Sequence, residues 1–496
     1  MANPTLNPPL VAPARFQTRA RSPRHALTLV GAIIVAACLR WACIHQSLFG
    51  DELFLYSEVH LRSLGQMLSL VHTMENTPPL FFLLAWVLAK GRSAMLLVRV
   101  PSLIASVAIV PLIYVLGRRV VGGCAALVAA AWFALSPFQI FYGTEDRAYA
   151  TVAALVLVST IALLIALERD RELRWWVVYA VAAIAAIYTH YIAALVLVPQ
   201  AAWALWTHRE LARRQIVWHG LVVVALLPWI PWFLAQARHS AHESVRLSSL
   251  SPLTPGNAAK TELQSLLGHP YVSPGVVPGL APLLVLAVLF GGVLVTLGYQ
   301  LWREPARSGR AMRGTGSLIV LLAIFPIAAI VVYSLRPHTS LLLPRNVEVG
   351  VPYALLLIGW LLTRWQPRTS LALSLVALAA LAAGSVKMLS PNYQRPDGAA
   401  AARFIDARAP AGAPVIDFPG PQGTEFYFRR VHPVLTPAQF GTSGWSAAAA
   451  RHLPVFVSLL HRGGCGRVAP HYRLLVERVW PSIPLALTVC EYVPAG

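Results

Sequence analysis

The chain has 496 residues, of which 57% are hydrophobic and only 12% are charged. Soluble proteins carry about 25% charged residues, so this composition excludes an ordinary soluble enzyme, and it also excludes disordered, collagen-like and small disulfide-rich chains. The net charge of +20 does not indicate nucleic-acid binding, because the arginines lie in short segments between apolar runs rather than on one soluble face. An integral membrane protein with many spans is the class that remains.

The apolar runs begin after a basic N-terminal tail, residues 1–25, which contains four arginines. A signal peptide is the alternative for the first run, but no small-residue cleavage site follows it, so we expect a membrane anchor. A span needs about 20 mainly apolar residues. Eleven runs come close to this length: 26–45, 95–116, 121–138, 148–167, 175–189, 190–206, 216–235, 277–299, 315–334, 346–362 and 370–386.

The run Pro78–Ala89 has only 12 residues, and the charge of the loops decides how to treat it. When it is left out and the N-terminus is cytoplasmic, the inner segments hold 18 Lys and Arg and the longer outer loops hold 9, as the positive-inside rule requires. Counting it as a span would invert every later loop. We therefore place Pro78–Ala89 on the outer membrane surface, within the first outer loop, residues 46–94.

The last part of the chain, residues 387–496, contains no run long enough to span, and eleven spans place it outside the cytoplasm. A helix over Gly398–Ala409 and strand-like runs at Ala413–Phe418 and Ala486–Val493 predict a small extracytoplasmic α/β domain. The predicted architecture is therefore mainly α, with a polytopic membrane helical bundle over residues 26–386 ahead of this domain.

Cys465 and Cys490 both lie in the predicted C-terminal domain. An oxidising compartment permits a disulfide between them, and two buried free thiols are the alternative. No cysteine spacing in the chain indicates a zinc site or an iron–sulfur cluster.

Acids and arginines gather in the predicted outer loops and at the ends of spans on the same side. They are Asp51, Glu52 and Glu75 in the first outer loop, Glu145, Asp146, Arg147 and Tyr149 in the next, His190 at a turn, and Arg345 at the start of the tenth span. Charges at membrane level are costly and are often functional. A carboxylate can accept a proton from an attacking hydroxyl, and the planar fork of arginine suits phosphate. These residues together predict one outward-facing site for a lipid-phosphate substrate. For any single acid, the alternative is an ordinary charge in contact with solvent.

Taken in chain order, the motifs resemble those of the GT-C membrane glycosyltransferases of the family-39 type, which include protein O-mannosyltransferases and lipid A aminoarabinose transferases. The resemblance covers residues 25–400. It rests on Gly50-Asp51-Glu52, Glu75-Asn76-Thr77-Pro78-Pro79-Leu80-Phe81-Phe82-Leu83-Leu84, Arg99-Val100-Pro101-Ser102, Leu116-Gly117-Arg118-Arg119, Ser136-Pro137, Tyr142-Gly143-Thr144-Glu145-Asp146-Arg147-Ala148-Tyr149, His190-Tyr191 and Pro344-Arg345. Three positions depart from the pattern: Asp146 stands where a small residue is more usual, Thr77 where many relatives have His, and Asn346 where Tyr is common.

This resemblance implies a hexosyl or pentosyl transferase that moves a sugar from a polyprenyl-phosphate donor to an acceptor hydroxyl outside the cytoplasm. The displacement would be inverting, with the lipid phosphate as leaving group. Asp51 matches the general base, and the implied catalytic set is Asp51, Glu52 and Glu145. The implied substrate-binding set is Glu75, Asp146, Arg147, Tyr149, His190 and Arg345. No metal and no cofactor is implied.

We accordingly expect a multi-pass protein of the bacterial inner (plasma) membrane, with a cytoplasmic N-terminus. Its partners would be the bilayer, the lipid-linked sugar and an acceptor that is a protein, a glycan or a lipid, with no nucleic acid. A lid over the acceptor is our hypothesis for the long outer loop 236–276. The alternative function is a non-enzymatic transporter or flippase of a lipid-linked saccharide, which predicts polar residues at the bilayer midplane and paired repeats.

Overall fold

The computed structural model describes residues 23–303, 315–418, 423–460, 464–466 and 470–495. Most of the predicted N-terminal tail and of the basic segment 300–314 lies outside the described residues. The α-helices are α1 Pro23–Cys43, α2 Asp51–Val59, α3 Leu64–Met74, α4 Leu80–Leu88, α5 Ala94–Leu97, α6 Val100–Val120, α7 Gly123–Leu135, α8 Pro137–Tyr142, α9 Tyr149–Glu168, α10 Leu173–Thr189, α11 Ala194–Thr207, α12 Ala212–Leu226, α13 Ile230–Leu250, α14 Pro255–Leu267, α15 Leu280–Arg303, α17 Thr315–Ser334, α18 Pro344–Val347, α19 Val351–Thr363, α20 Pro367–Met388, α21 Gly398–Arg408 and α22 Pro437–Ala450.

Among the described residues, eight helical segments are long and apolar enough to cross a membrane. They are Pro23–Cys43, Ala94–Val120, Tyr149–Glu168, Arg209–Arg238, Gly275–Thr296, Thr315–Ser334, Pro344–Thr363 and Pro367–Met388. Three shorter apolar helices, Gly123–Leu135, Leu173–Thr189 and Tyr191–Thr207, fall on the other predicted runs. The eleven apolar runs are thus all helical, and the crossing of the membrane by the three shorter ones stays a prediction.

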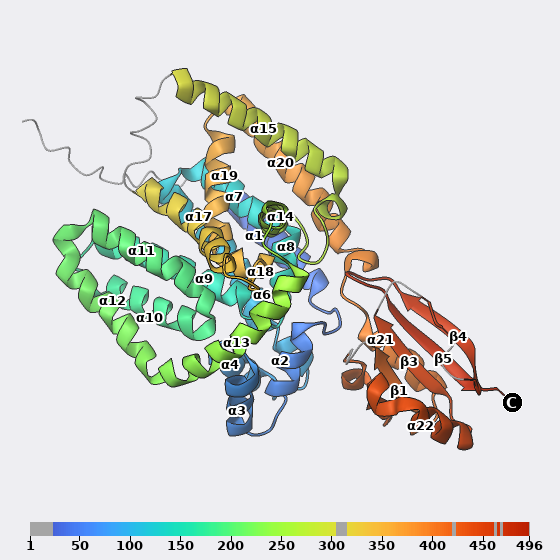
Figure 1. Cartoon of the computed structure of the whole chain (residues 1–496). Helices are drawn as coiled ribbons and strands as arrows, with labels where there is room; N and C mark the ends of the chain where they lie inside the picture. The colour runs from blue at the N-terminus through green and yellow to red at the C-terminus, as the bar shows by residue number, and fades with distance from the viewer. Residues whose placement is uncertain (1–22, 304–314, 419–422, 461–463, 467–469, 496) are drawn as a thin grey trace, which may run out of the picture.

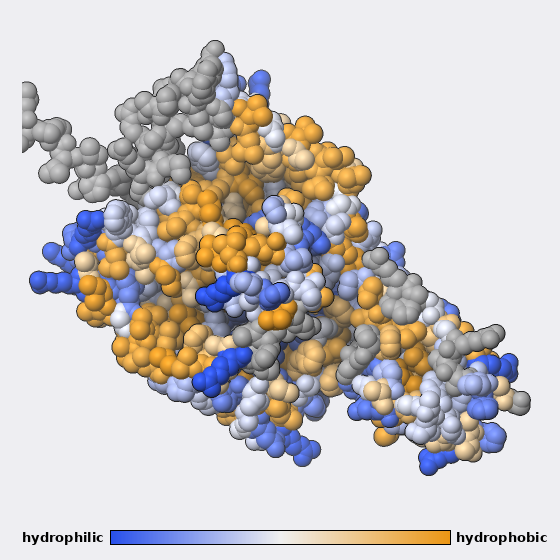
Figure 2. All heavy atoms as spheres, in the orientation of Figure 1, coloured by the Kyte–Doolittle hydropathy of each residue, from blue (hydrophilic) through white to orange (hydrophobic). Residues whose placement is uncertain are grey.

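The helices form one bundle around α9, and α6, α7, α10, α11 and α19 supply most of the buried core beside it. Small residues such as Ala129 and Ala153 are fully buried there and let the helices approach closely. The outer helices instead expose apolar side chains: Val288 of α15 is 76% exposed. Figure 2 shows this apolar surface over the bundle, where an aqueous protein would carry polar groups.

One end of the bundle is capped by α2, α3 and α4, which lie at the bottom of Figure 1. Their core includes Leu55, Val71 and Phe82. The helix α4 covers most of the run Pro78–Ala89 and has nine residues, which is about half the length of a span. It packs beside α2 in this cap and is not among the segments able to cross a membrane.

The segment 236–276, predicted as a long outer loop, is mostly helical. The helix α13 continues to Leu250, and α14 covers Pro255–Leu267. Thr254 caps the N-terminus of α14, since its hydroxyl accepts a hydrogen bond from the backbone N–H of Asn257. The polar Ser and His composition did not indicate these helices, and the role of the segment as a lid stays a prediction.

A small unit with a five-stranded sheet stands beside the bundle and contains the C-terminus (Figure 1). Its strands are β1 Val415–Phe418, β2 Val434–Leu435, β3 Val455–Leu460, β4 Tyr472–Trp480 and β5 Leu487–Pro494. The order is β2-β1-β3-β5-β4, with β1 parallel to β2 and β3, and β5 antiparallel to β3 and β4. Alternate side chains pack against α21 on one face and α22 on the other.

Cys465 and Cys490 form a disulfide, with their Cα atoms 5.8 Å apart. Cys490 lies in β5 and is fully buried, so the bond ties this interior strand of the sheet to the segment between β3 and β4. The sequence had left a disulfide and two free thiols open, and the structure has the disulfide.

Candidate functional site

A cavity of about 640 Å3 opens between the bundle and the part of the cap that contains α2 and the end of α3. One wall is ionic and carries Asp51, Glu58, Glu75, Arg147 and Arg345. Another part of the wall is apolar and carries Leu195, Leu247, Ala329, Ile330, Leu341 and Leu343. Such a cavity suits a molecule with a charged part and a hydrocarbon part.

Asp51 is the first residue of α2, and the glycine before it explains its position. Gly50 has φ 61° and ψ −125°, a conformation that side-chain-bearing residues rarely adopt. This turn separates Asp51 from the preceding loop and directs it to the cavity. Its carboxylate forms an ion pair with Arg345, from α18, although the two residues are 294 positions apart. The helix N-terminus also favours a negative charge at this place.

A second ion pair lies beside the first. Arg147 contacts Glu75 through two nitrogens, at 3.4 and 3.5 Å, and Glu75 is the residue that follows α3. The backbone of Arg147 is held by α6, because its carbonyl accepts a 2.8 Å hydrogen bond from Ser102. The cavity wall therefore carries two guanidinium groups, each with a carboxylate partner.

Two aromatic residues complete this wall. Tyr149 begins α9, and its ring lies 5.9 Å from the guanidinium carbon of Arg345 and 5.4 Å from the ring of His190. The Nδ1 of His190 accepts a hydrogen bond from the backbone N–H of Ile192, which caps the short turn ahead of α11. His190 thus both lines the cavity and stabilises a helix start.

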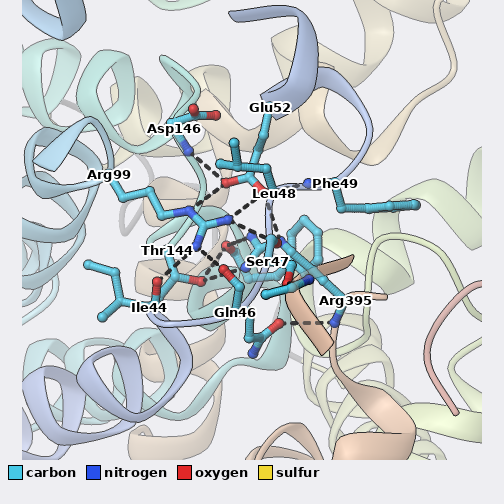
Figure 3. Close-up of polar contacts among 12 residues, drawn as sticks. Ile44, Gln46, Ser47, Leu48, Phe49, Glu52, Arg99, Thr144, Asp146 and Arg395 are labelled. Carbon is cyan, nitrogen blue, oxygen red and sulfur yellow. Dashed lines mark hydrogen bonds and ion pairs between the residues drawn. The ribbon is translucent and has the colours of Figure 1, made fainter. Parts of the chain in front are cut away.

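Glu52 is fully buried and does not line the cavity, and its carboxylate points toward Arg99 and Arg395 (Figure 3). It binds Arg99 through both oxygens, at 2.8 and 2.7 Å, and Arg395 lies 3.3 Å away. Backbone N–H groups of Phe49 and Asp146 also donate to it. Burial alone raises the pKa of a carboxyl, but the guanidiniums of Arg395 and Arg99 hold the pKa of Glu52 below its usual value.

Arg395 connects this cluster to the C-terminal unit. It donates to the carbonyl of Phe141 at 3.0 Å and to the Thr144 hydroxyl at 3.3 Å, and its backbone N–H donates to Gln46. Figure 3 shows Arg395 approaching from the opposite side to Arg99. Four segments distant in sequence meet at the Glu52 carboxylate, so we infer that it fixes the position of α2.

Glu145 and Asp146 lie behind the ionic wall and do not line the cavity. Both are buried, and the Glu145 Oε2 and both Asp146 carboxyl oxygens have no hydrogen-bond partner among the described residues. Burial, followed by the carboxylate of Glu52, raises the pKa of Glu145 to about 8 and raises the pKa of Asp146 well above its ordinary value. Contact of either with a substrate in this cavity is not supported by the geometry.

We expect the wild type to lose stability relative to Glu145→Gln as the pH rises. The pKa of Glu145, about 8, exceeds its ordinary value of 4.5, so the folded state holds the proton more tightly. The contribution of this proton to the free energy of unfolding is fully present below pH 4.5 and is lost as the pH rises through about 8. Glutamine has no proton to lose. Thermal melting in detergent across this window measures the effect, and parallel curves for the two proteins would contradict it.

The structure therefore brings together six of the nine predicted site residues in one cavity: Asp51, Glu75, Arg147, Tyr149, His190 and Arg345. Glu52, Glu145 and Asp146 are close by but buried. Glu58, Arg99 and Arg395 also lie at the site, and none of them was given a role from the sequence. Arg99 carried a signal, as an arginine inside the apolar run 95–116 and the first residue of the motif Arg99-Val100-Pro101-Ser102, whereas Arg395 had none. Among the described residues, no group of three or more His, Cys, Asp or Glu side chains could hold a metal ion.

The arrangement of the helices is that of known membrane enzymes. ArnT from Cupriavidus metallidurans, solved bound to undecaprenyl phosphate, is 14% identical, with a TM-score of 0.53 over 95% of this chain and 98% of ArnT. The oligosaccharyltransferase of Archaeoglobus fulgidus, solved tethered to an acceptor peptide, is 12% identical, with a TM-score of 0.54 over 89% of this chain and 69% of that one. The chain therefore has the fold of the GT-C membrane glycosyltransferases.

Within that class, residues 76–234 match the sequence model of the dolichyl-phosphate-mannose-protein mannosyltransferases. No curated protein matches the chain in sequence. The resemblance to family-39-type GT-C proteins expected from the motifs is confirmed, and the matched segment contains the cavity residues Arg147, Tyr149 and His190.

Proposed function

We propose that the protein is a membrane glycosyltransferase that moves a sugar from a polyprenyl-phosphate donor to an acceptor hydroxyl on the extracytoplasmic face. The observation that carries this proposal is the cavity with one ionic and one apolar wall. The apolar wall is continuous with α17, a helix able to cross the membrane, so a lipid chain can remain in the bilayer while its phosphate reaches the arginines. Support for the donor class comes from ArnT, which was solved with undecaprenyl phosphate, and from the archaeal oligosaccharyltransferase, solved with a dolichol-phosphate.

Asp51 is the proposed general base. In the structure Arg345 pairs with Asp51, and a donor phosphate would compete for the same guanidinium. Once Arg345 binds phosphate, Asp51 can take the proton of the acceptor hydroxyl while the oxygen of that hydroxyl forms a bond to the anomeric carbon. The bond from that carbon to the phosphate oxygen breaks, and the negative charge on the leaving lipid phosphate is stabilised by Arg345 and Arg147. A single displacement of this kind inverts the anomeric configuration.

Two features support the extracytoplasmic orientation. The helix ends opposite the cavity carry the basic pairs Arg118–Arg119 and Arg213–Arg214, as cytoplasmic segments do. The C-terminal unit contacts the segment before Asp51, since the Tyr427 hydroxyl accepts from the backbone N–H of Leu48, and this unit holds the disulfide. Disulfides persist outside the cytoplasm.

Transfer of radiolabelled sugar from a panel of polyprenyl-phosphate donors tests the function. Membranes containing the protein would be sorted into vesicles of each orientation, and label would be measured in protein, glycan and lipid fractions. Transfer that depends on access to the outer face is the expected result. Movement of the intact labelled lipid across the bilayer without transfer would instead establish the transporter alternative.

Arg345→Gln should raise the KM for the donor by roughly 10- to 100-fold, with a smaller effect on kcat. A hydrogen bond to a charged group contributes about 1.5–3 kcal/mol, which corresponds to this change in affinity. Arg336→Gln is a matched control, because Arg336 is exposed and does not line the cavity. A donor KM in Arg345→Gln equal to that of the control would remove Arg345 from phosphate binding.

A further inference from the structure

One carboxyl group in the cavity has no role in the proposed reaction. Glu58 lies seven residues after Asp51 in α2, and Phe54 lies between them. Spacings of three and seven residues place side chains on one face of a helix, and all three residues line the cavity. The rise of 1.5 Å per residue separates Asp51 and Glu58 by roughly 10 Å along the axis. Glu58 therefore faces a different part of a bound substrate from the reacting oxygen.

The burial of Glu58 is unusual for an acid on an accessible wall. Only 6% of the residue is exposed, and its Oε2 is buried without a hydrogen-bond partner among the described residues. The neighbouring Glu75 has Arg147 as its partner, whereas Glu58 forms no ion pair in the described part of the chain. An unsatisfied buried polar group costs free energy, and a ligand that satisfies it recovers that cost.

The protonation state of Glu58 indicates the chemistry it can recognise. Burial, and then the carboxylate of Glu75, raise the pKa of Glu58 to about 8, against the opposing effect of Arg147. At neutral pH most of this group is a neutral carboxylic acid, which both donates and accepts a hydrogen bond. A hydroxyl has the same pair of capacities, whereas a phosphate or an ammonium group does not.

We propose that Glu58 is a substrate-contacting residue that binds a hydroxyl group of the sugar or of the acceptor, and so helps to determine which substrate is used. This inference rests on the proposed function. The hydroxyl can belong to either substrate, and separate kinetic constants for donor and acceptor distinguish the two sources.

The test uses purified full-length protein, the donor that wild type transfers best, its monodeoxy analogues, and bare polyprenyl phosphate. Glu58→Ala should lower kcat/KM roughly tenfold, as expected for one buried hydrogen bond, and Glu58→Gln, which can still donate and accept, should retain more activity. For a sugar hydroxyl, one deoxy analogue lowers the wild-type rate but lowers the Glu58→Ala rate no further. If Glu58 binds an acceptor hydroxyl, the KM for the acceptor rises in Glu58→Ala, and each deoxy donor changes the rates of wild type and Glu58→Ala by the same factor.

Bare polyprenyl phosphate should inhibit wild type and both variants equally, because Glu58 is assigned no contact with phosphate. Ser57→Ala is the control, since Ser57 is an exposed neighbour of Glu58 in α2 that does not line the cavity. Glu58→Gln preserves the side-chain size. If Glu58→Ala does not fold, Glu58→Gln replaces it in the comparison of rates with the monodeoxy donor analogues. Unchanged donor and acceptor constants in a folded variant overturn the role of Glu58 alone. A wild type that neither transfers sugar nor binds polyprenyl phosphate overturns the proposed function and this inference together.

Discussion

Asp51→Asn is expected to lower kcat by about 100- to 10,000-fold, the range for loss of a general base. Asparagine has nearly the same shape but cannot take the acceptor proton. The free energy of unfolding should change little, because Asp51 is one-third exposed and an accessible ion pair contributes only about 0–1 kcal/mol. The measurement is the initial rate of sugar transfer, with protein amount and melting temperature determined in parallel.

The affinity of this variant for the donor separates catalysis from binding. Removing the Asp51 charge removes a competitor for Arg345, so polyprenyl phosphate should bind the variant as tightly as wild type or more tightly. Asp170→Asn is the matched control, because Asp170 pairs with Arg214 on the surface and does not line the cavity. Equal rates in Asp51→Asn and wild type would exclude Asp51 as the base. Loss of donor binding in the variant would assign Asp51 a binding role instead.

The fold was largely predictable because the bilayer imposes simple rules. A span requires a long apolar run and basic residues mark the cytoplasmic ends, so the positions of the membrane helices could be read from composition alone. The same rules do not apply to the polar segment after α12. There α13 continues for about 20 residues beyond its apolar start at Ile230, and hydropathy does not record whether a polar stretch is helical.

Most of the residues proposed for the site lie around one cavity, but the sequence did not indicate the direction of each side chain. Asp51 and Glu52 are adjacent in sequence, yet one lines the cavity and the other is buried, since successive residues of a helix point about 100° apart. Glu145, Asp146 and Arg147 lie in the segment between α8 and α9, and of these three only Arg147 lines the cavity. Which member of such a group faces the substrate depends on packing against distant elements.

Those distant elements include residues that no local pattern identifies. Arg395 follows the last long apolar helix by seven residues and has no motif around it, but it reaches Glu52 across 343 positions of sequence. Only the folded chain reveals that the linker to the C-terminal unit contributes to the support of α2. Long-range ion pairs of this kind are therefore the part of the site that sequence analysis misses.

Glu52→Gln should lower the free energy of unfolding by about 3–5 kcal/mol, which is the usual cost of removing one partner from a buried ion pair. The substitution leaves Arg99 and Arg395, both almost fully buried, facing a neutral amide. Thermal melting in detergent and the yield of folded protein measure the effect. Glu172→Gln is the control, because its ion pair with Arg174 is exposed and its loss should leave the melting temperature unchanged.

A double-mutant cycle shows whether this loss comes from the ion pair or from packing. Suppose that the buried charge of Arg395 causes the instability of Glu52→Gln. The double variant Glu52→Gln, Arg395→Gln should then lose much less free energy of unfolding than the sum of the losses in the two single variants. Additive losses would contradict the coupling and leave each residue a separate packing role. The activity of the double variant then reports on α2, since Asp51 can act as a base only while the first turn of that helix stays in place. Recovery of stability without recovery of activity would show that Glu52 serves to hold Asp51 at the cavity.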